Sequence, residues 1–165
     1  MAMTKAEAAS KSAFFPFFGG ISVLLAGFIS DKLGRSGRAM IILIGLLLSC
    51  VGLLALGNFS FAGSPRIPIW LVSTVAFTLI GPYSYLAGAL SLDFGGKQGG
   101  ATAAGIIDGV GYLGGVLAGD SVARISVAYG WQGAFNALAV VAVLSSLAAL
   151  VFLINQRRPV QYGER

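Results

Sequence analysis

Charged residues and glycines gather in one short stretch of an otherwise apolar chain, residues 27–38 (GFISDKLGRSGR). A carboxylate and several bases at this spacing can form ion pairs, which are strongest where water is scarce. Such a set makes and breaks no covalent bonds. Its ion pairs can hold two chain segments together or release them. We therefore interpret the stretch as a loop motif with a gating role, carried by Gly27, Asp31, Lys32, Gly34, Arg35 and Arg38.

Each member of this motif has an expected task. Gly34 supplies the tight reversal that a glycine tolerates, and Gly27 permits close contact with another helix. Asp31 pairs with Arg35 or Arg38 or caps a neighbouring helix. The alternative is a plain basic loop between two membrane helices, which needs no motif.

Other residue types that carry chemistry are scarce. The chain has no histidine, one cysteine and six acidic residues, so it lacks the commonest general base and metal ligand. The glycine pattern of residues 109–114 fits a dinucleotide fingerprint, but it lies inside an apolar helix without the required strand. We expect no enzyme activity, no catalytic residue, no metal and no cofactor.

Polar residues inside apolar segments are the remaining candidates for function, because burying them in a membrane is costly. Pro82 kinks its helix near the middle, and hydroxyls beside such a kink can line a transport cavity. The alternative is a merely structural kink. The residues expected to line a cavity are Pro82, Tyr83, Tyr85, Asp108 and Tyr112.

Asp108 lies on the same helix face as three glycines at four-residue spacing, Gly111, Gly115 and Gly119. Small residues at this spacing favour close helix packing in membranes. Asp108 then either makes a hydrogen bond across a packed helix pair or belongs to the transport path. Farther along, Asp120 and Arg124 stand four residues apart and suit an ion pair within one helix or, alternatively, a latch between domains.

The composition indicates which elements position these residues. Hydrophobic residues make up 56% of the 165 residues, charged residues make up 10%, and the mean hydropathy is +0.86. These values are typical of an integral membrane protein. The net charge of +5 comes from bases that lie between apolar segments, so we expect membrane lipid around the chain and no nucleic acid.

Apolar runs predict a polytopic, all-α membrane bundle with five transmembrane helices. Each run reaches the length of about 20 residues that a helix needs to cross a bilayer. The expected bundle covers residues 12–154, with an outer loop segment at 1–11 and a cytoplasmic tail at 155–165. The predicted spans are 12–30, 39–57, 67–92, 101–128 and 131–154.

The distribution of bases sets the expected orientation. If the loop at residues 31–38 is cytoplasmic, that side carries seven of the eleven bases and the other side carries four. This asymmetry agrees with the positive-inside rule. Residues 93–100 and the tail are then cytoplasmic, and residues 58–66 face outward.

Several motifs resemble those of a known family. The stretch G-x-x-x-D-K-x-G-R-x-x-R at residues 27–38 resembles the cytoplasmic-loop motif of the major facilitator superfamily. Residues 81–115 (GPYSYLAGALSLDFGGKQGGATAAGIIDGVGYLGG) resemble helices ten and eleven of its organophosphate:phosphate antiporter family. The run G-W-x-G-A-F at residues 130–135 is similar to the family's entry into helix twelve.

The resemblance implies that the spans are helices 8 to 12 of a twelve-helix transporter, with helices 1 to 7 missing and serving as partner. It implies exchange of a sugar phosphate or glycerol phosphate for inorganic phosphate by alternating access. In that family, arginines on helices one and seven hold the phosphate, so this chain is expected to be inactive alone. The bilayer would be a bacterial inner membrane or a eukaryotic equivalent. The alternative is a non-transporting membrane protein for assembly or regulation.

Overall fold

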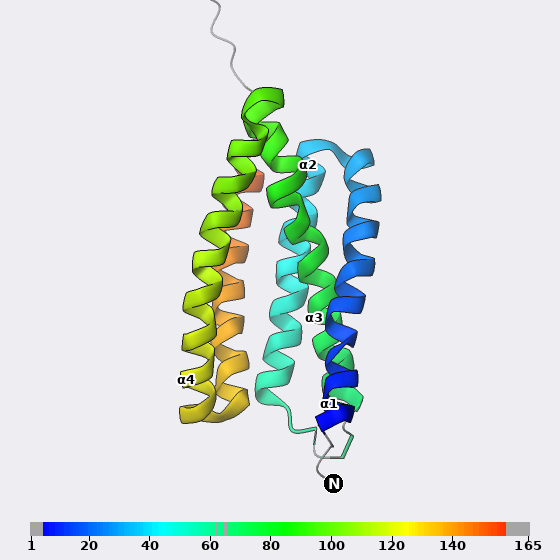
Figure 1. The fold of residues 1–165 in the computed structure, drawn as a ribbon, viewed down its shortest axis with the longest axis vertical. Coiled ribbons are helices and arrows are strands. Elements are labelled where there is room, and N and C mark those ends of the chain that lie inside the picture. Colours follow the sequence, from blue (N-terminus) through cyan, green and yellow to red (C-terminus); the bar gives the residue numbers. More distant parts are fainter. Residues whose placement is uncertain (1–4, 62, 65, 158–165) are drawn as a thin grey trace, which may run out of the picture.

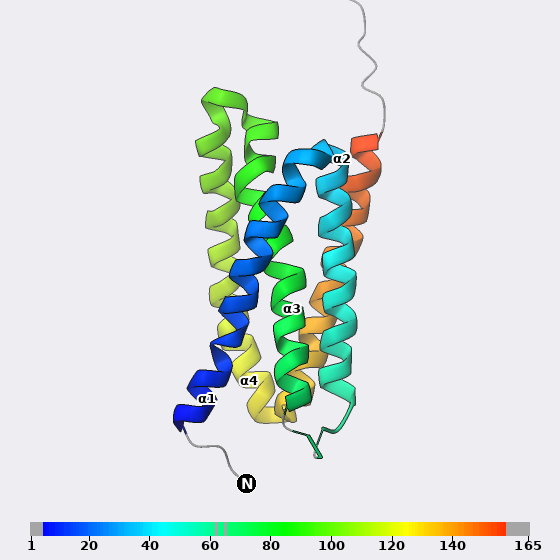
Figure 2. The same ribbon diagram turned by 90° about the vertical axis from the view of Figure 1, so that its right-hand side faces the viewer.

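Every element in the described part of the chain is helical. The computed structural model describes residues 5–61, 63, 64 and 66–157. Its long helices run side by side, which makes the fold a helical bundle (Figures 1 and 2). The elements are α1 (Lys5–Ser12), α2 (Phe14–Asn58), α3 (Arg66–Tyr85), a π-helical turn η1 (Leu86–Leu90) and α4 (Ser91–Arg157).

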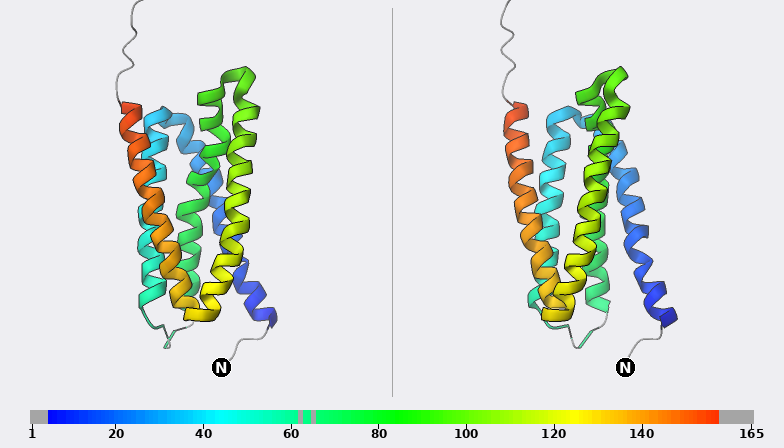
Figure 3. Two further views of the ribbon diagram at one scale, coloured as in Figure 1. Left: turned by 90° about the vertical axis from the view of Figure 1, so that its left-hand side faces the viewer. Right: turned by 60° about the vertical axis from the view of Figure 1, so that its left-hand side comes forward.

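Three glycines reverse the chain inside the two longest helices. Gly34 in α2 has φ 62°, and Gly96 and Gly130 in α4 have φ 60° and 70°. Only glycine adopts this region without steric cost, so each of these residues makes a corner. We call residues 14–33 and 35–58 the first and second arms of α2, and residues 97–129 and 131–157 the middle and last arms of α4 (Figure 3).

Three stretches of helix in the described residues are long and apolar enough to cross a membrane. They are Ala9–Gly34, Ser36–Asn58 and Arg66–Gln156, the last with 91 residues. A straight helix of that length would measure about 137 Å at 1.5 Å per residue. A hydrocarbon core is only about 30 Å thick. The all-helical membrane bundle is therefore confirmed, whereas the division of the third stretch into three crossings stays a prediction.

Several boundaries differ from the prediction. Residues 93–100, expected as a polar loop, stay helical on both sides of the single corner at Gly96. The expected outer segment at residues 1–11 contains the short helix α1 from Lys5. The corner at Gly34 lies at the predicted tight reversal, and the corner at Gly130 lies in the short gap between the spans predicted at 101–128 and 131–154.

α3 packs closely against both arms of α2. A Cβ on Gly81 would lie 2.8 Å from the carbonyl oxygen of Ser22, and one on Gly45 would lie 2.9 Å from Cγ of Pro82. These gaps are too small for a side chain, so the glycines are what lets the backbones meet. Ser49 Oγ lies 2.6 Å from Thr78 Oγ1, within hydrogen-bonding distance between the second arm and α3.

Candidate functional site

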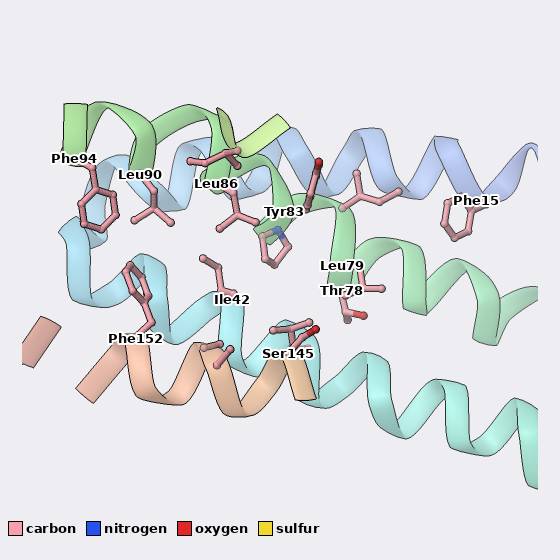
Figure 4. Close-up of a pocket in the computed structure, with 16 residues that line it drawn as sticks. Phe15, Ile42, Thr78, Leu79, Tyr83, Leu86, Leu90, Phe94, Ser145 and Phe152 are labelled. Atoms are coloured by element: carbon pink, nitrogen blue, oxygen red, sulfur yellow. The ribbon is translucent and has the colours of Figure 1, made fainter. Parts of the chain in front are cut away.

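A cavity of about 640 Å³ runs along the inside of the bundle (Figure 4). Figure 4 shows Phe94 and Phe152 at one end of it and Phe15 at the other. Both arms of α2, α3, η1 and both arms of α4 contribute to its wall. The lining residues are Phe15, Ile42, Leu46, Thr78, Leu79, Ile80, Pro82, Tyr83, Leu86, Leu90, Phe94, Ile107, Ser145, Ala148, Ala149 and Phe152.

The kinked part of α3 shapes the middle of this cavity. Pro82 has no N–H to give to the preceding turn, so the helix path bends there, and the π-helical turn η1 follows within a few residues. Phe94 and Phe152 close one end with ring centroids 6.0 Å apart. The cavity therefore lies beside the least regular part of the bundle.

The wall of the cavity is almost entirely hydrocarbon. Its polar side chains are Thr78, Tyr83 and Ser145, and none of the lining residues carries a charge. Thr78 already donates or accepts hydrogen bonds with Ser49 and with the carbonyl of Thr74. A phosphate dianion taken from water into such a wall would lose its hydration without a cation to replace it. This wall can hold apolar groups, and it cannot by itself hold a phosphate.

The residues predicted to line a transport cavity lie in different places. Pro82 and Tyr83 line the cavity, whereas Asp108 is half-buried outside its wall, beside the lining residue Ile107. Tyr112 is 78% exposed on the middle arm of α4. Tyr85 is only 2% exposed, and its hydroxyl donates to the carbonyl of Ala26 at 2.7 Å, so it fastens α3 to the first arm of α2.

A charged cluster lies near the Gly34 corner. Arg38 donates from Nη1 to Asp93 Oδ2 at 2.7 Å and from Nε to Ser30 Oγ at 2.8 Å. The side chains of Arg38 and Asp93 are 16% and 19% exposed, so water screens this pair little. One guanidinium therefore connects both arms of α2 to the start of α4.

This arrangement corrects one expectation and leaves another open. Arg38 pairs with Asp93 and not with Asp31, because the second arm turns its guanidinium toward α4. Asp31 is exposed and makes no ion pair with another described residue. Lys32 Nζ lies 4.3 Å from the ring centroid of Phe28, and the side chain of Arg35 lies outside the described residues.

The glycines singled out for packing also differ in their surroundings. A Cβ on Gly111 would lie 3.1 Å from the hydroxyl of Tyr83, so this glycine contacts α3. Gly115 and Gly119 have nothing within 4 Å of such an atom, and neither has Gly27, so no close helix approach occurs at these three within the described chain. The Gly115 side of the middle arm is left uncovered.

The predicted pair within the middle arm is confirmed. Arg124 Nε donates to Asp120 Oδ2 at 2.7 Å, and the two side chains are 79% and 64% exposed. An exposed pair of this kind contributes little to stability.

The sequence of this chain is similar to those of several known membrane proteins. This chain is 34% identical to the Membrane sensor protein UhpC of Escherichia coli over 145 residues, which are 86% of this chain and 32% of that protein. It is 30% identical to a Probable hexose phosphate transport protein of Chlamydia pneumoniae over 91% of this chain and 33% of that protein. A Glycerol-3-phosphate transporter of Haemophilus influenzae is 30% identical over 81% of this chain and 31% of that protein.

These relatives are organophosphate:phosphate antiporters of the major facilitator superfamily, and the chain is similar to them over most of its own length. No family model matches it, and no solved structure matches it either. The chain spans about a third of the length of the curated relatives that it matches. Its similarity to membrane transporters and its long apolar helices make it an integral membrane protein.

The sequence alone does not indicate two residues of the charged cluster, Asp93 and Ser30. Asp93 lies 55 positions from Arg38 in the chain, and nothing local indicates that the two meet. Ser30 ends an apolar run and looks like an ordinary boundary residue. The available signal was that Asp93 is an acidic residue beside a glycine corner on the same predicted membrane side as Arg38.

Proposed function

We propose that this chain forms helices 8 to 12 of a twelve-helix secondary transporter, which exchanges a sugar phosphate or glycerol phosphate for inorganic phosphate by alternating access. Relatives named for hexose phosphate and glycerol 3-phosphate transport support the substrate class. The chain's share of about a third of their length supports the view that more helices complete the transporter.

The proposed five crossings follow from dividing the third apolar stretch at its two corners. Gly96 and Gly130 break 91 residues of helix into lengths that suit one bilayer crossing each. The predicted domains then stand as proposed, with residues 1–11 as an outer segment, 12–154 as the partial bundle and 155–165 as a cytoplasmic tail.

The composition of the cavity wall is the main support for the proposal that this chain is inactive on its own. Its lining residues include no lysine and no arginine. Among the described residues, Arg38, Arg66 and Lys97 lie instead near helix ends and corners. The arginines that hold phosphate in this family would have to come from helices one and seven, which would belong to the partner part.

Exchange of radioactive phosphate in liposomes tests this proposal. The 165-residue chain alone should give no exchange above protein-free liposomes. Reconstitution with a separately produced segment containing helices 1 to 7 of a related transporter should give exchange that saturates with glycerol phosphate or hexose phosphate. Saturable exchange by the chain alone would contradict the proposal.

A sensing role is the second candidate, because one of the matched relatives is named a membrane sensor. In that role the assembled protein would bind a phosphorylated sugar without moving it. The assembled protein would then bind glucose 6-phosphate in a calorimetric titration and still fail to exchange phosphate. Exchange at a measurable rate would exclude a purely sensing role, and the same outcome would count against an assembly protein without substrate.

The orientation of the bundle and the gating role of its loop motif belong to the same proposal. In a Cys50→Ala background, a cysteine at Ser64 should react with a membrane-impermeant maleimide from outside, and one at Lys97 only from the cytoplasm. Asp31→Asn should loosen cytoplasmic closure in the complete transporter and raise labelling at that side. Reversed labelling would overturn the orientation, and unchanged labelling and flux in Asp31→Asn would remove the gating role.

A further inference from the structure

A second pocket lies at the end of the bundle away from the Gly34 and Gly96 corners. It has a volume of about 170 Å³ and lies between α1, the start of α2 and the start of α3. Figure 2 shows α1 and the start of α3 at this same end. We call it the rim pocket, and its lining residues are Lys11, Phe14, Arg66, Ile69, Trp70 and Ser73.

Aromatic rings surround the rim pocket. The ring centroid of Trp70 lies 6.5 Å from that of Phe14 and 5.8 Å from that of Phe18. Aromatic rings, tryptophan above all, gather where a membrane protein passes through the lipid headgroup layer. Arg66 begins α3, and Lys11 lies in the last turn of α1, so both cations stand where the apolar stretches start. These features are those expected of a pocket at the depth of lipid phosphates.

The lining combines two cations with hydrocarbon. No acidic side chain is among the six lining residues. The hydroxyl of Ser73 donates to the carbonyl of Ile69 at 2.8 Å, so it is already engaged in its own helix. A free sugar phosphate would bring several hydroxyl groups that this wall cannot satisfy. An amphipathic anion fits better, because its charge can meet the cations while its hydrocarbon contacts the rings.

We propose that the rim pocket binds the phosphate end of an anionic phospholipid from the surrounding membrane. A volume of about 170 Å³ is below the range of about 300 to 1,000 Å³ typical of sites that enclose a small molecule. It holds only the part of the lipid near the glycerol. The acyl chains continue along the exposed apolar side chains of α2 and α3, such as Phe17 and Ile67.

Native mass spectrometry of the 165-residue chain tests the site directly. The chain is purified in detergent with equal amounts of phosphatidylglycerol, phosphatidylcholine and diacylglycerol, and the lipid that stays bound is counted. Phosphatidylglycerol should be retained in preference to the other two. Arg66→Gln and Lys11→Gln should each weaken that retention about fivefold, the effect of one basic residue near an anionic surface.

Arg124→Gln is the matched control, because Arg124 is an exposed cation near the Gly130 corner, at the same end as the rim pocket but outside it. It should retain phosphatidylglycerol like the parent. Trp70→Ala should instead weaken retention of all three lipids, since it removes hydrocarbon contact rather than charge. Circular dichroism confirms that the variants keep their helices.

Two results would overturn the proposal. Equal losses in Arg66→Gln and Arg124→Gln would mean that net charge, not the rim pocket, attracts the lipid. Displacement of phosphatidylglycerol by free glycerol phosphate would mean that the pocket takes soluble phosphate. Retention that is selective, sensitive to Arg66 and insensitive to free glycerol phosphate would establish a lipid site, whether or not the chain belongs to a transporter.

Discussion

α3 and the middle arm of α4 carry similar small residues in opposite surroundings. Around α3, the absence of a side chain at Gly45 and Gly81 lets backbones meet at distances that no Cβ would allow. On the middle arm, Gly115 and Gly119 have open space beside them. The difference shows that a glycine pattern indicates a capacity for close packing, while the presence of a partner decides whether that capacity is used.

The largest expected effect separates these two helices. Gly81→Ala would place a Cβ 2.8 Å from the carbonyl oxygen of Ser22, and we expect it to lower the free energy of unfolding by about 2 to 3 kcal/mol. Gly115→Ala, the matched control, has nothing within 4 Å and should stabilise its helix by up to about 1 kcal/mol. Denaturation in detergent, followed by helical circular dichroism, measures both. Equal effects would contradict the comparison.

The next effect concerns the ion pair at the corner. Asp93→Asn would leave the guanidinium of Arg38 largely buried without its carboxylate. We expect the free energy of unfolding to fall by about 2 kcal/mol. This is less than the roughly 3 to 5 kcal/mol expected for breaking a fully buried ion pair, because some water reaches the Arg38–Asp93 pair.

Exchanging the two charges gives the control for that variant. The double substitution Arg38→Asp and Asp93→Arg should recover more than half of the loss. No recovery would mean that the geometry around Ser30, and not the charge pair, stabilises the corner.

A smaller effect compares two tyrosines of α3. Tyr85→Phe removes the hydroxyl that donates to the carbonyl of Ala26 in the buried contact with α2, which should cost about 1 kcal/mol. Tyr83→Phe, half-exposed at the cavity, should change stability by less than about 0.5 kcal/mol. The same denaturation experiment compares the two variants. A larger loss of stability in Tyr83→Phe than in Tyr85→Phe would contradict the structural role given to the Tyr85 hydroxyl.

The smallest effect belongs to the exposed pair of the middle arm. Asp120→Asn removes a contact whose side chains are 64% and 79% exposed, and an i,i+4 pair of this kind is worth about 0.3 to 0.5 kcal/mol. The loss should disappear at high salt. If Asp120→Asn lowered the free energy of unfolding as much as Asp93→Asn does, the Asp120–Arg124 pair would have to be buried. The middle arm would then be covered by another helix, contrary to the exposure of this pair in the chain.

The parts of the fold that can be predicted from the sequence are those that depend on neighbouring residues. Apolar runs locate the helices, and single glycines locate the corners at Gly34 and Gly130, because both follow from neighbouring residues. The polar run at residues 93–100 suggests a loop, yet it stays helical on both sides of Gly96. Local composition is a weak guide to where a helix ends.

Contacts between distant segments account for what the sequence does not predict. The pairing of Arg38 with Asp93 and the contact of Ser49 with Thr78 depend on which helix faces rotate toward each other. Periodicity did place Asp108 on the face of Gly111 and Gly115, but it cannot say whether that face is covered. Tyr83 and Tyr85 stand two residues apart and so point to opposite sides of α3, but the sequence does not say which side faces the cavity and which faces α2.

The π-helical turn Leu86–Leu90 sets the register of everything that follows it. Such a turn holds one residue more than an α-helical turn, which advances by about 100° per residue. Asp93 therefore faces Arg38 because an extra residue is stored one turn earlier. Shortening the chain by one residue at Gly88 should let the segment relax into a plain α-helix and keep Asp93 and Phe94 facing Arg38 and Phe152. Straightening the turn without removing a residue would instead rotate both side chains by about 100° away from these partners. The turn therefore lets the helix carry one additional residue without changing which side chains meet.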